Sequence, residues 1–344
     1  MRRLLPGVLL LAFAAALPAA KSLEIYFIDV EGGQATLFVG PTGESMLVDT
    51  GWGGFNGRDA GRIAAAAKSA GVKKIDYLVI THYHEDHVGG VRQLAAKLPI
   101  VTFVDHGPDV ETGKDAQAIF LAYEEFRAKG RHILAKPGDT IPVKDLQVQV
   151  VASAGEAYRT GYVAYYGGDN ISTPGEANPS CSAFRHQAAD ASENAQSLGL
   201  MVSFGDFSMA DLGDLTWNKE FELVCPNNNK IGHVSLFLAS HHGLNSSNSP
   251  QLVSALRPRV AIVNNGARKG GSPKTWQTLH DSPGLEDIWQ LHYAAGAPKD
   301  HNSADPFIAN IDEICQGMWL RVTAQKDGSF TVYNSRNKYR KDYP

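Results

Sequence analysis

The amino-acid sequence predicts a mixed α/β fold of the α+β class, in which mixed β-sheets are flanked by helices. The chain begins with β-type runs separated by glycine-rich turns, which is typical of an antiparallel meander; the runs cover residues 23–29, 35–39 and 45–49. Strand and helix patterns then alternate, which favours mixed sheets covered by helices. Hydrophobic residues make up 43% and charged residues 20% of the 344 residues, so the chain can bury a core without a disulfide scaffold.

The remaining elements follow from local patterns. An alanine-rich segment at 58–70 ends at Gly71 and predicts a helix, and the apolar run at 77–80 predicts a buried strand. Further helices are expected at 88–98, 114–129, 250–256 and 274–280, and further strands at 100–104, 146–152, 198–204, 207–210, 234–239, 260–263, 288–291, 319–324 and 330–334. Residues 153–195 show no clear period and predict a long insertion. Since no linker or repeat divides the chain, we expect a single domain over residues 21–344.

The first twenty residues predict a secretory signal peptide. Arg2 and Arg3 precede an apolar run at 4–17, which is too short to span a bilayer, and small residues follow at 18–20. No later segment is long and apolar enough to cross a membrane, so we expect an exported protein, periplasmic or secreted. Removal of the leader lowers the formal net charge from −4 to −6, which excludes a strongly basic nucleic-acid footprint.

Export also bears on the three cysteines. In an oxidising compartment one disulfide with one thiol left over is expected, and three unpaired structural cysteines are the alternative. Cys181 and Cys225 both lie in stretches rich in Asn and Pro, so we expect these two to pair and Cys315 to remain free. No cysteine has the spacing of a metal-ligand motif.

Three histidines and an aspartate follow the 77–80 strand within six residues, as His82-x-His84-x-Asp86-His87. Alternate side chains leaving a strand point the same way, so His82 and His84 are expected to converge on one cation. Asp86 and His87 then face a second cation, about 3.5–4 Å from the first. Imidazole and carboxylate donors suit Zn²⁺ first, with Mn²⁺ or Fe as alternatives.

Two later strand ends supply further donors. Asp214 follows the 207–210 strand and is predicted to be the carboxylate that bridges the two cations, with Asp211 as its rival. The 234–239 strand runs into His241 and His242. Because His241 leaves the strand first, we expect it to complete the second metal set and His242 to contact substrate or act as an acid. These five histidines of the motif and the pair are the functional part of the 12 in the chain.

The His82–His87 motif, Gly213-Asp214 and His241-His242-Gly243 together resemble the metallo-β-lactamase-fold hydrolase superfamily. Segments 28–35, 47–51 and 240–247 further resemble the soluble hydrolase domain of the competence channel protein ComEC, a branch linked to phosphodiester cleavage. The resemblance covers about residues 23–291. It implies an αββα sandwich of two mixed sheets flanked by helices, with two metal ions at one sheet edge.

The resemblance also marks a departure and further candidates. Many relatives place another histidine ligand between the motif and the bridging aspartate, where this chain has Asn194, and His186 has poor spacing for that role. Water, substrate phosphate or Asn194 would then fill the first metal's coordination. Asp49 ends a strand beside the motif and is expected to brace a ligand histidine, with a simple turn aspartate as the alternative. His292 is a candidate for substrate contact.

These features predict an exported binuclear-metal hydrolase. A hydroxide bridging the two cations would attack a phosphodiester, with Asp86 orienting it and His242 acting on the substrate. The substrate is a small-molecule or polymer phosphodiester; nucleic acid is among the candidates, although the acidic charge does not imply it. One alternative is a lactonase or β-lactamase-type ester or amide hydrolase. Another is a metal-binding module without catalytic activity.

Overall fold

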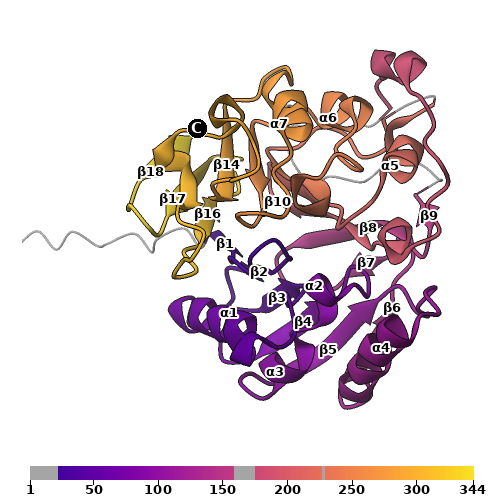
Figure 1. The fold of residues 1–344 in the computed structure, drawn as a ribbon, viewed down its shortest axis with the longest axis vertical. Coiled ribbons are helices and arrows are strands. Elements are labelled where there is room, and N and C mark those ends of the chain that lie inside the picture. Colours follow the sequence, from indigo (N-terminus) through magenta and orange to yellow (C-terminus); the bar gives the residue numbers. More distant parts are fainter. Residues whose placement is uncertain (1–21, 159–174, 227–228) are drawn as a thin grey trace, which may run out of the picture.

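The computed structural model describes residues 22–158, 175–226 and 229–344, so the predicted leader lies outside the described residues. Two mixed sheets pack face to face, and helices cover their outer faces (Figure 1). The first sheet has the order β18-β17-β16-β1-β2-β3-β4-β5-β6. Its strands are β1 (Leu23–Phe27), β2 (Thr36–Val39), β3 (Ser45–Val48), β4 (Ile75–Val79), β5 (Ile100–Asp105), β6 (Arg131–Leu134), β16 (Leu320–Ala324), β17 (Phe330–Asn334) and β18 (Arg340–Tyr343). The αββα class expected from the sequence is confirmed.

The second sheet has the order β15-β14-β13-β12-β11-β10-β8-β7, and β9 pairs with β8. Its strands are β7 (Thr140–Ile141), β8 (Gln147–Ser153), β9 (Glu156–Ala157), β10 (Gly199–Phe204), β11 (Phe207–Asp211), β12 (Leu236–Leu238), β13 (Val260–Val263), β14 (Asp287–His292) and β15 (Ile308–Asn310). The run from β3 to β6 and the run from β11 to β15 are parallel. The expected antiparallel meander is present as β1-β2-β3. The carboxyl ends of parallel strands are where open sheets place their sites, and both sheets have such an edge.

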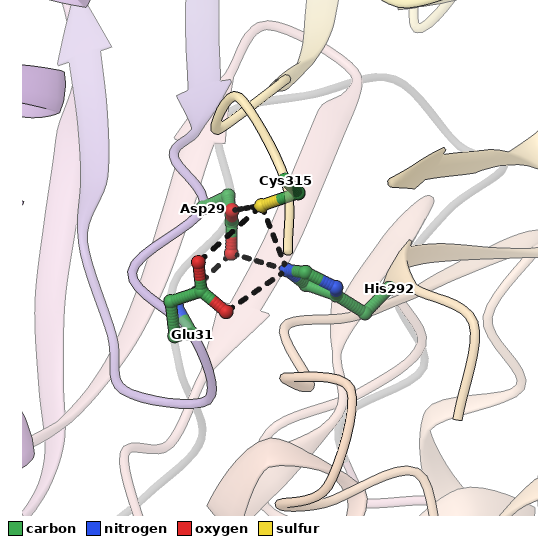
Figure 2. A group of neighbouring side chains, drawn as sticks. All are labelled: Asp29, Glu31, His292 and Cys315. Carbon is green, nitrogen blue, oxygen red and sulfur yellow. Dashed lines mark hydrogen bonds and ion pairs between the residues drawn. The ribbon is translucent and has the colours of Figure 1, made fainter. Parts of the chain in front are cut away.

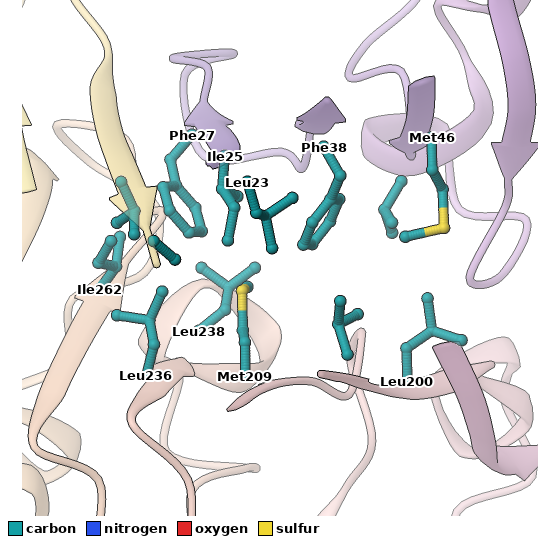
Figure 3. Packing of buried hydrophobic residues seen from close by; sticks show 14 of the residues in the cluster. Leu23, Ile25, Phe27, Phe38, Met46, Leu200, Met209, Leu236, Leu238 and Ile262 are labelled. Carbon is teal, nitrogen blue, oxygen red and sulfur yellow. The ribbon is translucent and has the colours of Figure 1, made fainter. Parts of the chain in front are cut away.

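The main core lies between the two sheets. Strand residues alternate between faces, so Leu23, Ile25 and Phe27 of β1 point inward, where they join Phe38 and Met46 from the neighbouring strands (Figure 3). The second sheet offers them a facing set that Figure 3 also labels: Leu200, Met209, Leu236, Leu238 and Ile262. Both sets are buried, so this apolar layer sets the spacing between the two sheets.

Two further apolar clusters attach the helices. The outer face of the first sheet packs on α1 (Arg58–Ser69), α2 (Glu85–Val88), α3 (Val91–Ala95) and α4 (Lys114–Arg127). The outer face of the second sheet packs on α5 (Trp217–Val224), α6 (Pro250–Leu256) and α7 (Pro273–His280). Within the described ranges, no helix is long and apolar enough to cross a membrane.

The structure differs from the expected elements in several places. The single helix at 88–98 is wrong: α2 and α3 are separate, and they meet at Gly89-Gly90. A Cβ on Gly90 would lie 2.2 Å from the Thr50 carbonyl oxygen, so only glycine fits where α3 begins. Helix α5 was missed because buried Glu220 interrupts its apolar pattern. Residues 153–195 are not all irregular, since they contain β9 and short 3₁₀ turns at Pro179–Ala183 and Glu193–Gln196.

Cys181 and Cys225 form a disulfide across a sequence separation of 44, as expected, and Cys315 is free. The bond ties the turn at Pro179–Ala183 to the end of α5. Because the crosslink restricts the unfolded chain, replacing both cysteines by serine should lower the free energy of unfolding by about 2–4 kcal/mol. Denaturant titration measures this loss. Thiol labelling of the unreduced, unfolded wild type should detect Cys315 alone, and labelling of all three cysteines would contradict the bond.

The core between the two sheets allows a further test of stability. Phe38 is fully buried between the sheets, whereas Phe55 is 62% exposed. Replacing Phe38 by alanine should lower the free energy of unfolding by about 3–5 kcal/mol, because a cavity forms in a packed layer. The matched Phe55→Ala variant, which loses only a contact with Arg58, should stay within about 1 kcal/mol of the wild type. Equal effects of both substitutions in thermal or denaturant unfolding would show that the layer does not carry this stability.

Candidate metal centre

The histidine motif lies at the carboxyl end of β4, which is flanked in parallel by β3 and β5. The chain leaves β4 through His82, caps α2 with His84, and places Asp86 and His87 inside that short helix. His82 and His87 are fully buried, and His84 is half-buried. β4 and α2 thus hold the side chains of His82, His84, Asp86 and His87 on one short segment beside the first sheet.

Asp49 and Thr81 orient the motif from behind. Asp49, at the end of β3, accepts hydrogen bonds from the Thr81 backbone N–H (2.8 Å) and the Thr81 hydroxyl (2.7 Å). Its Oδ2 also lies 2.7 Å from His87 Nδ1. A carboxylate can only accept, so His87 donates from Nδ1 and turns its Nε2 lone pair toward the centre. The contact expected between Asp49 and a motif histidine is therefore present.

Asp214 lies at the middle of the centre. It follows β11, and its Oδ2 is surrounded by four imidazole Nε2 atoms: those of His87 (3.2 Å), His241 (3.4 Å), His242 (3.6 Å) and His82 (3.8 Å). Its other oxygen, Oδ1, is buried and has no hydrogen-bond partner in the described part of the chain. Asp211, the rival, instead accepts hydrogen bonds from Gln34 Nε2 at 3.0 Å. The geometry therefore favours Asp214 as the shared carboxylate.

One donor group consists of Asp86, His87, Asp214 and His242, each with one donor atom within 4.8 Å of all the others. Asp86 Oδ2 lies 3.0 Å from His242 Nε2, which in turn lies 3.2 Å from His87 Nε2. Four donors that share so small a volume fit one cation.

His82 and His84 form the second part of the centre. His82 Nε2 lies 3.1 Å from His84 Nδ1, so both nitrogens face the same point. The opposite nitrogens are held in place: His84 Nε2 lies 3.0 Å from a Glu111 carboxylate oxygen, and His82 Nδ1 lies 3.1 Å from the Thr81 hydroxyl. With Asp214 beside His82, this pair offers three donors for a second cation.

His242, and not His241 as expected for the second metal set, lies in the group of four donors. Both residues lie in the turn Ser240–Gly243 after β12 with a φ of 54°, which turns their rings apart. His242 is fully buried and joins the group of four, whereas His241 reaches only Asp214 and remains partly exposed. His241 Nδ1 lies 3.0 Å from the Ser246 hydroxyl. Order of exit from the strand does not predict which ring is buried, because both histidines lie in a left-handed turn.

The charges of the centre suit cations. Burial alone would raise the pKa of Asp214 and Asp86, but the neighbouring histidines hold both well below the usual range. Burial lowers the pKa of His82 well below its usual value, so its ring is neutral. Burial acts the same way on His87, but Asp214, Asp86 and Asp49 outweigh it and raise its pKa well above the usual value. Ionised carboxylates and a neutral His82 ring suit metal binding, and a cation at the centre would take the place of the proton that the carboxylates favour on His87.

Several contributing residues escaped the sequence analysis. Lys269, in the turn before Gly270-Gly271, contacts Asp86 Oδ2, and its Nζ lies 4.7 Å from the centre of the Trp52 ring. Ser197, rather than Asn194, touches the centre: its hydroxyl accepts from the Asp214 backbone N–H at 3.1 Å. No sequence signal distinguishes Lys269 from the other lysines.

Two of the named candidates lie apart from the centre. Within the described residues, Asn194 makes no hydrogen bond to the motif histidines or Asp214, and its side-chain oxygen is buried without a partner. His292 contacts Asp29 at 2.8 Å and belongs to a different cluster, so a role in contacting substrate at the centre is not supported. The resemblance to relatives suggested Asn194, and His292 was a candidate from the sequence, but neither observation reports distance in the fold.

A cavity of about 320 Å³ adjoins His241 through Ser246. It is lined by Gln187, Ala188, Asp190, Thr216, Trp217, Asn218, Asn245, Ser246 and Lys274. The Lys274 ammonium lies 4.7 Å from the centre of the Trp217 ring. The cavity therefore combines an aromatic wall, amides and hydroxyls with one ammonium group, that of Lys274, and one carboxylate, that of Asp190.

The chain is similar to several known proteins. The ComE operon protein 3 of Bacillus subtilis (strain 168) is 27% identical over 198 residues, which is 57% of this chain and 20% of that protein. A hydroxyacylglutathione hydrolase of Cronobacter sakazakii is 38% identical over 66 residues, 19% of this chain and 26% of that protein. The chain thus spans about a fifth to a quarter of the length of these relatives. The solved structure of the metallo-β-lactamase fold protein YhfI from Bacillus subtilis aligns with a TM-score of 0.48 and 8% identity, over 78% of this chain and 95% of that one.

A family model also matches the part of the chain that carries the histidine motif. The model of the metallo-beta-lactamase superfamily matches residues 28–170, a range that includes Asp49 and the whole His82–His87 motif. The resemblance expected from the motifs is confirmed. Residues 28–170 of this chain thus match the metallo-β-lactamase superfamily.

Proposed function

We propose that this protein is an exported hydrolase that uses two divalent cations to cleave a phosphodiester. The observation that carries the proposal is the burial of Asp214 among four imidazole nitrogens. Burying so many polar groups is unfavourable unless they bind something that satisfies them. His82, His84 and Asp214 would hold one cation, and Asp86, His87, His242 and Asp214 the other. When bound, such cations lower the pKa of a water toward neutrality and neutralise charge on the substrate.

The remaining chemistry belongs to this chain's own side chains. The ionised Asp86 carboxylate can accept a hydrogen bond from the attacking water and orient it. His241 faces Asp214 from the exposed side, and burial lowers its pKa, so its neutral ring can accept a hydrogen bond or a proton from the substrate or from a water. The Ser246 hydroxyl holds its other nitrogen in place. His241 therefore takes the substrate role first expected of His242.

The lysines favour a phosphodiester over a neutral ester. Lys269 lies at the centre beside Asp86, and Lys274 lines the adjoining cavity. Ammonium groups at both places suit a substrate with a negative charge at the reacting group. The overall acidic balance of the chain favours a small or locally bound phosphodiester over long duplex DNA.

Export is supported by the Cys181–Cys225 disulfide, since disulfides persist in oxidising compartments. Expression of the full chain in a host with a secretory pathway tests this part. Fractionation should recover the protein outside the cytoplasm, with an N-terminus near residue 21. Retention of Arg2 and Arg3 in cytoplasmic protein would contradict export.

The function itself is tested by metal analysis coupled to a substrate panel. Zinc-loaded wild type should cleave bis(p-nitrophenyl) phosphate, and Asp214→Asn, which keeps the shape but loses the charge, should lose both metal and activity. The match to hydroxyacylglutathione hydrolases favours a second candidate, an ester or thioester hydrolase. Cleavage of a hydroxyacylglutathione or a lactone, with the phosphodiester left intact, would establish it. Metal binding without any turnover would indicate a binding module.

A first prediction concerns Asp49. Because Asp49 orients His87 without entering the centre, Asp49→Asn should weaken metal binding about 10- to 100-fold and leave the fold intact. Competition with a chelator measures the affinity, and excess zinc should restore activity. The matched control is Asp300→Asn, which changes a side chain that is 82% exposed and should bind metal normally. A normal affinity for Asp49→Asn would show that its hydrogen bond does not matter.

A second prediction concerns Lys269. Loss of a charged contact to the phosphate should lower kcat/KM for the phosphodiester about 10- to 100-fold in Lys269→Ala. Lys269→Arg should keep part of the activity, and Lys68→Ala, at an exposed position on α1, should keep all of it. Steady-state kinetics on a neutral ester provides the comparison. An equal loss on both substrates would mean that Lys269 acts through Asp86 and not through the phosphate.

A further inference from the structure

A second group of metal-type donors lies outside the centre described above. Asp29, Glu31, His292 and Cys315 each place one donor atom within 4.8 Å of all the others, and we call them the Asp29–Cys315 cluster. Asp29 and Glu31 follow β1, His292 ends β14, and Cys315 lies between β15 and β16 (Figure 2). Three segments that are far apart in the sequence thus bring four different side chains to one point.

The donors converge on a single nitrogen. His292 Nε2 lies 2.8 Å from Asp29 Oδ1, 3.7 Å from Glu31 Oε2 and 3.7 Å from Cys315 Sγ. The thiol sulfur also lies 3.1 Å from Asp29 Oδ2 and 3.3 Å from Glu31 Oε1. A nucleophilic relay would use the two nitrogens of the histidine separately, one toward the thiol and one toward a carboxylate. Here one nitrogen faces all three partners, which is the arrangement of ligands around an ion.

The cluster has more acceptors than donors. Asp29 and His292 are fully buried, and Glu31 is 22% exposed. His292 Nδ1 is buried without a hydrogen-bond partner in the described ranges. A divalent cation bound between His292 Nε2, the two carboxylates and the sulfur would satisfy all four of these ligand atoms.

Arg62 lies beside the cluster and contacts three of its members. Its Nη1 donates to Asp29 Oδ2 at 2.8 Å and to Glu31 Oε1 at 3.1 Å, and its Nη2 lies 3.4 Å from Cys315 Sγ. These bonds leave Asp29 Oδ1 and Glu31 Oε2 as the oxygens that face His292. Outer hydrogen bonds of this kind fix ligating carboxylates in metal sites.

We propose that the Asp29–Cys315 cluster binds a further divalent cation, zinc, in a closed four-ligand site that is separate from the catalytic centre. One thiolate, one imidazole and two carboxylates suit the tetrahedral coordination of zinc. Binding replaces the S–H proton of Cys315 by the cation and releases that proton to solvent. The charges then balance, since the thiolate and two carboxylates meet the two charges of the cation and the one of Arg62.

Such a site would brace the catalytic centre. The chain continues from Glu31 to Gln34, whose backbone N–H donates to the Asp86 carbonyl (3.1 Å) and whose side chain donates to Asp211. A cation held by Asp29 and Glu31 would fix this loop to β14 of the second sheet and to the segment before β16. The inference does not depend on the hydrolase proposal, because it concerns a structural cation at different residues.

Two other roles for Cys315 are less well supported. Burial and the Asp29 carboxylate raise the pKa of the Cys315 thiol to about 12, so it is a poor nucleophile as it stands. It has no cysteine partner, since Cys181 and Cys225 are bonded to each other. A hydrogen-bonded network closed by protons alone is the rival explanation, and the experiment distinguishes the two.

The test uses cobalt as a spectroscopic probe in the full-length protein. The catalytic centre offers only imidazole and carboxylate donors, and the other two cysteines form a disulfide. A thiolate-to-cobalt charge-transfer band in the near ultraviolet therefore reports Cys315 alone. Wild type should show this band and bind about three metal ions per chain, whereas Cys315→Ser and Glu31→Gln should lose the band and bind about two. The matched control is Glu313→Gln, an exposed carboxylate on the same segment, which should keep the band.

The outcomes separate this inference from the proposed function. Loss of the catalytic metals in Asp214→Asn with the band retained would establish an independent site. Two metals and full activity in the wild type without the band would overturn the third site and leave the hydrolase proposal intact. The band without phosphodiester cleavage would support the third metal site and contradict the hydrolase proposal. The wild-type spectrum alone decides whether the third cation is bound. The inference can therefore be overturned even if a variant folds poorly.

Discussion

The buried Asp214 carboxylate is the group on which the arrangement of the centre depends. A carboxylate away from water is strongly unfavourable unless opposite charge or donors surround it. Here one oxygen faces the nitrogens of four imidazole rings, and those rings come from the end of β4 in one sheet and from the turn after β12 in the other. The centre therefore exists only where the edges of the two sheets meet, and the apolar layer between the sheets sets that distance.

The loops at this edge are held by further polar contacts. Asp49 and Thr81 orient His87 from the first sheet. Glu220 of α5 accepts the backbone N–H groups of Asn248 (2.6 Å) and Ser249 (2.8 Å), which ties down the segment that follows His241 and His242. These contacts fix positions of donors that would otherwise move as flexible side chains on loops.

The Asp29–Cys315 cluster extends this principle to the opposite side of the loop after β1. On one side of that loop the Gln34 side chain donates to Asp211 of β11, and on the other side Asp29 contacts His292 of β14. Each side thus joins the first sheet to the second. The molecule thus uses polar clusters at the sheet edge where its apolar layer cannot extend, because backbone leaving the strands needs hydrogen-bond partners.

Much of the fold was predictable because its signals are local. The bounds of α6, β13 and β17 match expectation, since strand and helix periodicities are written within a few residues. The elements that were predicted wrongly also have physical causes. Helix α5 buries Glu220, and α2 and α3 are separated by a contact between Gly90 and Thr50 that lies far away in the sequence.

The sequence by itself determined the donor types and their local grouping: the His82–His87 motif, one aspartate after β11, and a histidine pair after β12. It also indicated which cysteines pair, from the similar composition around Cys181 and Cys225. Only the tertiary structure decided which histidine of the pair enters the centre, that Lys269 lies beside Asp86, and that His292 joins Cys315. The reason is geometric: ring direction after a left-handed turn and contacts between distant segments depend on how the two sheets pack, which no local spacing encodes.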